Sequence, residues 1–376
     1  IEAANPMTYR RWASLHRAIG LALLLHWALL ALTGMLLVFH RDIEQKMLGS
    51  VPGNDRPVSL DAVTQSVAAA RPGADLLQIS TLNGGMGLLR IRVKPDGDGE
   101  VRSLVFDTGT NTIVGDSPLS GSVRTDGALQ FVYRLHQTLL LGDSGKTLVV
   151  ISSLFLIATA LAGYRLLWPQ RRNWRRIVRP KLIGNARTKM TLIHRATGVV
   201  TGPVLILLAI TGAGMNWTPP IKSAFAGIGL ADAPPTPRDS KGALRLGPDA
   251  ALAAAQQRFP TAHFTSITLP AGGSALYAIR LRQPREAHAI FGMTNIQIDG
   301  ATGAIVSVTD PRRARPGDKL LEWLFALHNG EFLGLPGRLL VLLTGAALFT
   351  LCLLGGAAWL RTPRRQRAPA SVRENV

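Results

Sequence analysis

Four long apolar runs without a single charged side chain dominate the hydropathy pattern of the chain. Each contains at least eighteen residues, and they occupy positions 18–40, 147–164, 196–221 and 339–360. About 20 apolar residues cross a bilayer core of roughly 30 Å as an α-helix. The pattern therefore predicts four transmembrane helices. The first run is expected to be a true span and not a cleaved signal peptide, because no small-residue cleavage site follows it.

The two long segments between spans one and two and between spans three and four are patterned differently. Each begins with an alanine-rich amphipathic helix, at positions 60–70 and 248–258, and each helix stops just before a proline. Short strand-like runs separated by turn signals follow. These runs cover 88–93, 102–106 and 112–114 in the first segment, and 275–281, 295–298 and 304–308 in the second. Each segment is therefore predicted to form a small α+β domain.

The chain is an internal duplication. Equivalent positions of the two halves are His16 and His194, Gly20 and Gly198, Thr33-Gly34 and Thr211-Gly212, His136 and His328, and Gly163 and Gly355. The offset between equivalent positions grows slowly along the chain, as loop insertions would make it do. Both halves begin on the same side of the membrane, so the repeat is a parallel one with its pseudo-twofold axis along the membrane normal.

These patterns predict a polytopic α-helical membrane protein with four transmembrane helices in two parallel repeats and two α+β domains outside the membrane. The expected segments are transmembrane helix 1 at 10–40, the first α+β domain at 41–127, an interfacial helix at 128–145, transmembrane helix 2 at 146–168, a basic loop at 169–192, transmembrane helix 3 at 193–218, the second α+β domain at 219–319, an interfacial helix at 320–336, transmembrane helix 4 at 337–361 and a tail at 362–376.

The formal net charge of +19 is concentrated beside the spans. Positions 165–195 alone contain ten lysines and arginines and no acidic residue, and further arginines precede the first span and follow the last. Basic residues mark the cytoplasmic side of a membrane protein. We therefore expect both termini and the basic loop in the cytoplasm and the two α+β domains on the far side. Because the positive charge flanks spans, it does not indicate a nucleic-acid partner.

Cysteine usage excludes several cofactors. Cys352 is the only cysteine and lies inside the fourth span. The chain therefore has no intrachain disulfide, no cysteine-ligated iron–sulfur cluster and no Cys-x-x-Cys-His attachment site for a c-type haem. Any haem would be held non-covalently.

Histidines recur in register at the ends of the apolar runs. His16 and His194 lie near the cytoplasmic ends of the first and third spans, whereas His136 and His328 lie before the second and fourth spans on the other side. Ionisable residues are costly in a membrane and usually functional, and neutral imidazole is an axial ligand of haem iron. We expect two bis-histidine haem sites on the pseudo-twofold axis, one formed by His16 with His194 and one by His136 with His328. The alternative is that these side chains anchor the helices at the interface.

A second ligand set remains open. His26 lies in the middle of the first span and His40 at its end, fourteen residues apart and therefore on similar faces of a helix. The second half has Val204 and Thr218 at the equivalent positions. A pair so spaced on one helix can ligate two stacked haems, so His26 and His40 are alternative ligands.

Glycines and arginines accompany the histidines of the first and third spans. Gly20 and Gly198 follow His16 and His194 by four residues, on the same helix face. They are expected to face a haem, although small residues also serve close helix packing. Arg17 and Arg195 are expected to contact haem propionates or to act as positive-inside anchors.

The order of these motifs resembles the PepSY-associated transmembrane helix family of bacterial inner-membrane proteins. The resemblance is carried by the two Leu/Ile-His-Arg-x-x-Gly openings, the two Thr-Gly pairs, the Leu-His motifs at 136 and 328 and the strand-Asp-x-x-Gly-strand endings, and it covers Met7 to about Arg365. Members include iron-regulated proteins and siderophore reductases similar to FoxB. The resemblance implies periplasmic PepSY domains, b-type haem and electron transfer to a periplasmic ferric siderophore. With the histidine pairing described above, two haems are expected per chain.

The expected function is therefore that of a haem-dependent ferric-siderophore reductase, an oxidoreductase that releases Fe(II) for iron uptake. No Gly-x-Gly-x-x-Gly fingerprint follows a strand, so the electron donor, a quinone or a cytoplasmic protein, is expected to be external. Two other functions remain open. One is a haem-free regulatory membrane protein whose PepSY domains bind a partner, and the other is a permease.

Overall fold

The computed structural model describes residues 6–47, 58–82, 84–97, 99–119, 127–167, 173–232, 242–286 and 291–362. The chain divides into two compact units. The first consists of residues 1–38, 136–216 and 327–376 and contains the long helices. The second consists of residues 39–135 and 217–326 and contains the sheet. The predicted tail at 362–376 lies almost entirely outside the described residues.

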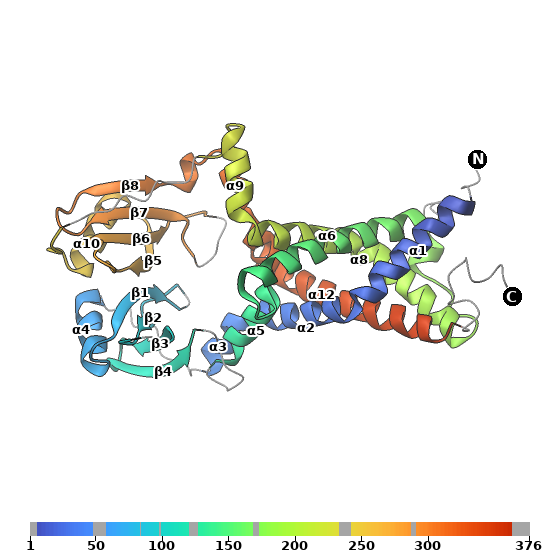
Figure 1. Cartoon of the computed structure of the whole chain (residues 1–376), viewed down its shortest axis with the longest axis horizontal. Helices are drawn as coiled ribbons and strands as arrows, with labels where there is room; N and C mark the ends of the chain where they lie inside the picture. Colours follow the sequence, from blue (N-terminus) through green and yellow to red (C-terminus); the bar gives the residue numbers. More distant parts are fainter. Residues whose placement is uncertain are drawn as a thin grey trace. The chain divides into compact units, whose positions relative to one another are not determined.

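The first unit is a bundle of long apolar helices (Figure 1). They are α1 (Pro6–Ala22), α2 (Leu24–Val38), α6 (Gly142–Leu167), α8 (Ala186–Asn216) and α12 (Leu335–Leu360). Among the described residues, α6, α8 and α12 are each long and apolar enough to cross a membrane, and α1 with α2 passes the same test as a bent pair. The predicted class, a multi-pass helical membrane protein with α+β structure between its spans, is confirmed.

The first span is not the straight helix that its sequence suggests. The axes of its two parts, α1 and α2, differ by 61°. The backbone bonds from Leu23 N to Ile19 O and from Trp27 N to Leu23 O persist across the break, at 3.0 and 2.9 Å. Bends of this size usually occur at proline, at glycine or at an irregular turn. The part described here contains Gly20 close to the break and no proline there, so the hydropathy pattern gave no sign of the bend.

The spans pack through small residues. Helix α6 packs against α1 and α8, and α12 packs against α2 and α8. A Cβ at Gly202 of α8 would lie 2.4 Å from Oη of Tyr164, whose hydroxyl donates to the carbonyl of Val199 over 2.9 Å. A Cβ at Gly345 of α12 would lie 2.7 Å from Cγ of Met35. Side chains at these glycines would push the helices apart, as expected for helix association in lipid.

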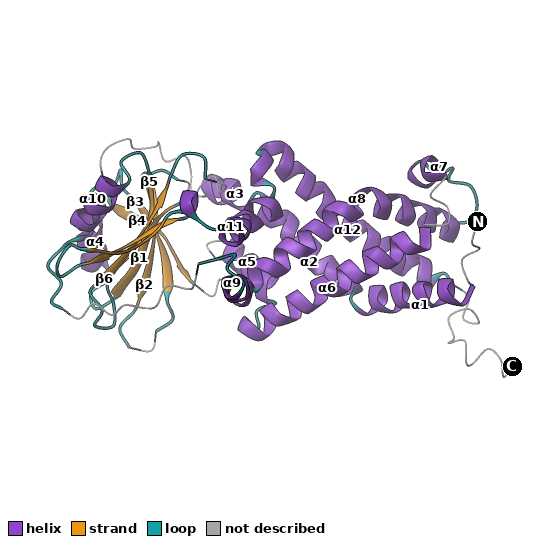
Figure 2. Ribbon diagram, turned by 90° about the horizontal axis from the view of Figure 1, so that it is seen from above, coloured by secondary structure: helices purple, strands orange, loops and turns teal. Residues whose placement is uncertain are grey.

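The second unit contains one eight-stranded sheet and several shorter helices (Figure 2). Its strands are β1 (Asp75–Thr81), β2 (Leu88–Lys94), β3 (Arg102–Asp107), β4 (Thr112–Pro118), β5 (His263–Thr268), β6 (Leu276–Arg282), β7 (Thr294–Asp299) and β8 (Ile305–Thr309). The helices are α3 (His40–Met47), α4 (Leu60–Ala70), α9 (Thr218–Gly227), α10 (Pro248–Arg258) and the 3-10 turn η2 (Pro311–Arg313). Helices α5 (Ala128–Thr138) and α11 (Pro316–Asn329) lead from this unit back to the bundle.

Three short elements complete the description. They are α7 (Trp174–Val178) in the basic loop, the 3-10 turn η3 (Glu331–Leu333) before α12, and the first two turns of α8, which begins at Ala186 and not at the predicted 193. Basic residues such as Arg187 and Lys189 interrupt the apolar pattern in the first turns of α8, so the apolar run begins later than the helix does. The helix continues because neither residue opposes helical conformation.

The two α+β domains expected from the sequence share one sheet. Its strands run in the order β4-β3-β2-β1-β5-β6-β7-β8, all antiparallel. The halves meet where β1 pairs with β5, with Ile79 opposite Ile267. These two strands were absent from the sequence prediction, because each is a short run directly after a helix and a proline. They are the elements that join the repeats.

The core lies between one sheet face and the helices α4 and α10. Leu60, Val63 and Val67 of α4 and Ala251 and Ala255 of α10 pack against the buried strand residues. The side chain of Asp249, in the first turn of α10, accepts a 2.7 Å bond from the backbone N–H of Leu60 in α4. One half therefore caps the helix of the other, and a carboxylate at that position is favourable because of the helix dipole.

We expect the β1–β5 junction to be essential for the stability of the sheet. Ile267 is fully buried, so Ile267→Ala should lower the free energy of unfolding of this unit by about 2–4 kcal/mol. Pulse proteolysis of detergent-solubilised protein across a urea series would measure this change. The control is Ile305→Ala on edge strand β8, where the side chain is 42% exposed, and the change should stay within about 0.5 kcal/mol. Equal losses in the two variants would contradict a core centred on the junction.

Candidate functional site

Two pairs of histidines meet inside the helical unit. The imidazole centroids of His16 in α1 and His194 in α8 are 6.1 Å apart, with ring planes at 84°. Those of His136 in α5 and His328 in α11 are 6.3 Å apart, with ring planes at 54°. The structure thus brings together the same two pairs that the repeat predicts. They lie towards opposite ends of the bundle, because α1 contributes to one pair and the end of α2 contacts the other.

Each imidazole of the first pair is held through Nδ1 by a backbone carbonyl of a neighbouring span. Nδ1 of His16 lies 2.8 Å from the carbonyl oxygen of Thr159 in α6, and Nδ1 of His194 lies 3.1 Å from that of Leu351 in α12. A carbonyl only accepts hydrogen bonds. Nδ1 must therefore carry the proton, and a neutral ring then has its lone pair on Nε2.

The second pair uses threonine hydroxyls for the same purpose. Nδ1 of His136 lies 3.0 Å from Oγ1 of Thr33, and Nδ1 of His328 lies 3.0 Å from Oγ1 of Thr211. Each hydroxyl already donates its one proton to a carbonyl one turn earlier, that of Leu29 or Leu207, over 2.8 Å. Each threonine oxygen must then accept from the imidazole. All four histidines share one tautomer, and no described residue hydrogen-bonds to their Nε2 atoms.

Glycines make room for all four rings. A Cβ on Gly163 or Gly355 would lie 3.3 or 3.4 Å from Cε1 of His16 or His194 respectively. Beside the second pair the space is tighter. A Cβ on Gly34 would lie 3.1 Å from Cε1 of His136, and one on Gly212 would lie 2.9 Å from Cε1 of His328. Each ring therefore rests against backbone on one side, which restricts its rotation.

A tight turn after α5 positions His136. Leu139 and Leu140 adopt positive φ angles of 51° and 63°, a left-handed conformation that costs a residue with a side chain roughly 1–2 kcal/mol. A Cβ on Gly145 would lie only 1.7 Å from the carbonyl oxygen of Thr138. The first turn of α6 thus packs directly on the end of α5. The second half repeats this contact, because a Cβ on Gly337 would lie 2.2 Å from the carbonyl oxygen of Gly330.

The separation within each pair fits an axially ligated haem iron. Imidazole nitrogen binds such a metal at about 2.0 Å. With the metal midway between two Nε2 atoms, the ring centroids would be roughly 6.2 Å apart, close to the observed 6.1 and 6.3 Å. Aromatic rings in edge-to-face contact cover a similar range, so distance alone does not decide. The common tautomer adds a second feature that an axial ligand needs, because Nε2 of all four rings has no hydrogen bond to a described residue.

The second pair is kept uncharged. Burial, followed by the nearby His328, lowers the pKa of His136 to about 4, and burial also lowers the pKa of His328. Both rings are therefore neutral at pH 7, the form that ligates metal. Among the described residues, no three histidine, cysteine or carboxylate side chains converge on one point. A two-histidine site of this kind suits a metal whose remaining ligands come from a macrocycle.

The alternative ligands lie elsewhere. Nε2 of His26 is 2.8 Å from Oγ of Ser152, and that hydroxyl donates to the carbonyl of Val149 over 2.9 Å. The ring therefore donates through Nε2, the atom that a haem iron would need. His40 begins α3 in the other unit. The structure pairs the four histidines of the symmetric set with one another, so that set is the better candidate.

The predicted glycines Gly20 and Gly198 do not lie against the histidine rings. A Cβ on Gly20 would meet nothing within 4 Å, and one on Gly198 would meet only Cδ2 of Leu351, at 3.7 Å. There is open space at Gly20, where a haem face was expected, and its assignment stays a prediction. Arg17 is exposed and Arg195 is half-buried, and their contacts with propionates also stay predictions.

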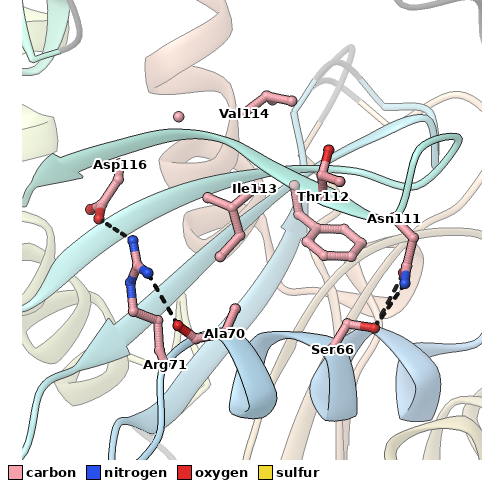
Figure 3. Close-up of a pocket in the computed structure, with 10 residues that line it drawn as sticks. Ser66, Ala70, Arg71, Asn111, Thr112, Ile113, Val114 and Asp116 are labelled. Atoms are coloured by element: carbon pink, nitrogen blue, oxygen red, sulfur yellow. Dashed lines mark hydrogen bonds and ion pairs between the residues drawn. The ribbon is translucent and has the colours of Figure 1, made fainter.

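A separate pocket lies in the sheet unit, between α4 and edge strand β4 (Figure 3). Its volume is about 530 Å³. Its polar groups bind one another: the guanidinium of Arg71 lies 2.9 Å from the carboxylate of Asp116, and Asn111 donates to Ser66 over 3.1 Å. With its charges paired internally, this pocket is not the candidate site.

The sequence did not indicate the groups that hold the imidazoles. The carbonyls of Thr159 and Leu351 leave no trace in residue type. The repeated Thr-Gly pairs were visible in the sequence. In each pair the threonine hydroxyl accepts a hydrogen bond from a histidine ring, and the glycine next to it leaves room for the same ring. The matching Gly163 and Gly355 carried another, although Gly20 and Gly198 were expected to take that role.

These features define a multi-pass membrane protein, built by duplication, in which anchored histidine pairs lie between the spans and an α+β sheet is inserted into both halves. The comparison with protein families agrees. The family described as PepSY-associated TM region matches residues 13–362, and the chain therefore belongs to this family. No curated protein matches the chain.

The threonine anchor can be tested by an isosteric change. Thr211→Val removes the acceptor for Nδ1 of His328, and loss of such a supporting bond should weaken haem binding about 10–100-fold. Titration of haem-free protein with haem would measure the change. Thr211→Ser keeps the hydroxyl and should bind nearly as wild type. Thr201→Val, in the same helix, controls for general damage, because the hydroxyl of Thr201 donates to the carbonyl of Thr197 within that helix. Tight binding by Thr211→Val would contradict the anchoring role.

Proposed function

We propose that this protein is a di-haem b-type membrane reductase, which passes electrons across the bacterial inner membrane to a ferric siderophore in the periplasm. The proposal rests on the two symmetric histidine pairs. Their four rings share one tautomer, and the rings of each pair have the separation that axial ligation requires. His16 and His194 would hold one haem, and His136 and His328 the other. When bound, haem supplies reversible one-electron chemistry.

The residues of the chain have three tasks in this function. The carbonyls of Thr159 and Leu351 and the hydroxyls of Thr33 and Thr211 orient the imidazoles and increase their basicity. The glycines beside the rings fix their rotation. The apolar spans exclude water from the sites, which tunes the potential of a bound redox group.

The positions of the pairs support a transmembrane route. One pair lies near the beginning of the first span and the other near its end, so the two sites would lie near opposite membrane faces. The basic loop orients the termini to the cytoplasm. The electron donor would be a quinol or a cytoplasmic protein. One electron reduces siderophore-bound Fe(III) to Fe(II), which hard oxygen donors hold more weakly, and the iron is released for uptake.

Haem content should follow the histidine pairs. The wild-type protein, purified in detergent from haem-replete cells, should contain about two b-type haems per chain, with low-spin bands in the reduced-minus-oxidised spectrum. His16→Ala, or His194→Ala, should reduce this to about one, and each should leave the same haem in place. His136→Ala and His328→Ala should each remove the other haem.

The other histidines provide the controls for this experiment. His26→Ala should keep both haems, because His26 donates its Nε2 proton to Ser152. His263→Ala, on β5 of the sheet unit, should do the same. Loss of a haem in His26→Ala with retention in His194→Ala would favour the alternative ligand set. Colourless wild-type protein would contradict the proposed function and favour a regulatory PepSY protein.

Electron transfer needs both pairs. In proteoliposomes with a reductant enclosed and an impermeable ferric siderophore outside, wild-type protein should produce Fe(II), trapped as a coloured ferrous chelate. Removal of either haem, by His194→Ala or by His328→Ala, should lower the rate at least about 100-fold, because the intervening distance becomes that of half a membrane. His263→Ala should retain the wild-type rate. Full activity in either single-haem variant would show that the pairs do not act in series.

A further inference from the structure

One face of the eight-stranded sheet is free of the helices that form the core. The strand residues packed against α4 and α10 include Leu89, Ile91 and Val93 of β2 and Ile279 and Leu281 of β6. Successive residues of a strand point to opposite faces. The residues between them therefore lie on the other face. We call it the open face.

The open face is mostly polar from β2 to β8, whereas Val105 of β3 lies in a small buried apolar cluster with Leu82 and Leu88. Strand pairing aligns its residues in two rows. The first row is Ser103, Arg92, Gln78, Thr268, Ala278, Gln297 and Ser307. The second row is Val105, Arg90, Ser80, Ser266, Arg280, Asn295 and Thr309. Apart from Val105 and Ala278, these two central rows carry arginines, hydroxyls and amides. The carboxylates of this face lie one row further out, Asp107 opposite Leu88 and Asp299 opposite Leu276, and each accepts a backbone bond from the turn that follows its strand.

Arg92 and Arg280 are equivalent residues of the two repeats. The pseudo-twofold axis of the sheet passes between β1 and β5, beside the pair Ile79 and Ile267. Arg92 lies opposite Gln78 on β1, and Arg280 lies opposite Ser266 on β5, the position equivalent to Gln78. The two arginines therefore flank the centre of the open face symmetrically.

Neither of these arginines is neutralised. Among the described residues, the guanidinium groups of Arg92 and Arg280 make no ion pair and no hydrogen bond, whereas Arg90 forms an ion pair with Glu44 of α3. Part of the Arg92 side chain reaches solvent. Its pKa is nevertheless lowered, first by partial loss of surrounding water and then by the nearby positive charge of Arg90. Tyr133 acts in the opposite direction. A positive charge placed among like charges without a counter-ion is stabilised by a bound anion.

Hydrogen-bonding groups form the floor between the two arginines. Nε2 of Gln78 donates to Oγ1 of Thr268 over 3.5 Å, and Oγ of Ser80 donates to the carbonyl of Arg90 over 3.3 Å. Ser266 lies opposite Ser80. These bonds are long, so the hydroxyls and the amide can be recruited by a ligand at little cost.

The dimensions suit a compact ligand. Arg92 on β2 and Arg280 on β6 are separated by three interstrand spacings of about 4.8 Å each, hence by roughly 14 Å across the sheet. Guanidinium groups at the ends of such side chains can converge on an object several ångströms wide lying over the floor. Guanidinium binds carboxylate and phenolate oxygens through short, charge-assisted bonds.

We propose that the open face binds a ferric chelate of net negative charge, such as a carboxylate or catecholate complex, through Arg92 and Arg280. The choice of an iron chelate rests on the proposed reductase function, whereas the preference for an anion rests on the sheet alone. Neutral and cationic chelates, including those built only from hydroxamates, would be poorer ligands of this face.

A redox-inert probe separates this inference from the reductase proposal. Full-length protein in detergent would be titrated by calorimetry with the gallium(III) complex of a tris-catecholate, and with the neutral gallium(III) complex of a tris-hydroxamate of similar size. Gallium(III) undergoes no reduction here, so binding does not depend on haem or on electron transfer. The anionic complex should bind at least about 10-fold more tightly, and its affinity should fall with added salt.

Variants then locate the site. The double variant Arg92→Gln/Arg280→Gln should weaken binding of the anionic complex at least about 10-fold and leave the neutral complex unchanged. Arg245→Gln removes one exposed positive charge from the same unit, in the segment before α10 and outside the strands, and should have little effect. Circular dichroism would confirm that the variants fold. Equal affinity of wild-type protein for the two complexes would overturn the proposal without any variant.

An anionic lipid headgroup presents similar oxygen chemistry. Flotation of the protein's nanodiscs with vesicles containing phosphatidylglycerol would detect it. Loss of vesicle binding in the double variant, together with unchanged binding of the gallium tris-catecholate, would assign the arginines to lipid and overturn the chelate site. Normal haem content without anion binding would contradict this inference alone, and anion binding by a colourless protein would contradict the reductase alone.

Discussion

The structure depends on the hydrogen bond that holds Nδ1 of each paired histidine. An acceptor without a proton to give, a carbonyl for His16 and His194 and an engaged hydroxyl for His136 and His328, fixes the ring in one tautomer. A buried polar ring without such a partner would be costly in a bilayer. The hydrogen bond at Nδ1 therefore lowers the cost of burying the histidine. It also leaves Nε2 as the ring nitrogen with a free lone pair.

Duplication explains why each end of the helical bundle contains two histidines that are anchored in the same way. Every supporting group has its counterpart, such as Thr33 and Thr211 or Gly163 and Gly355, so the two halves contribute equally to each pair. The same symmetry joins β1 to β5 in one continuous sheet and relates Arg92 to Arg280. His26 breaks it, since it lies opposite Ser152 and the second half has valine at its place.

The sequence predicted the parts that depend on periodicity and composition. Four apolar runs, two α+β inserts and the pairing of equivalent histidines all followed from pattern. The bend at Leu23, strands β1 and β5, and the carbonyl partners Thr159 and Leu351 did not. A bend and a strand junction are decided by tertiary packing, and a backbone carbonyl is the same in every residue. The glycines were visible, but only the distances show that Gly163, and not Gly20, lies against the ring of His16.

The most direct test is electron paramagnetic resonance of the oxidised wild-type protein at low temperature. Two bis-imidazole sites predict two low-spin ferric signals. They should be distinguishable, because the angle between ligand planes controls the anisotropy of such signals and the pairs differ, at 84° and 54°. A protein without ferric haem signals, or with a high-spin signal that shows an open axial position, would contradict the assignment of the histidine pairs as haem ligands.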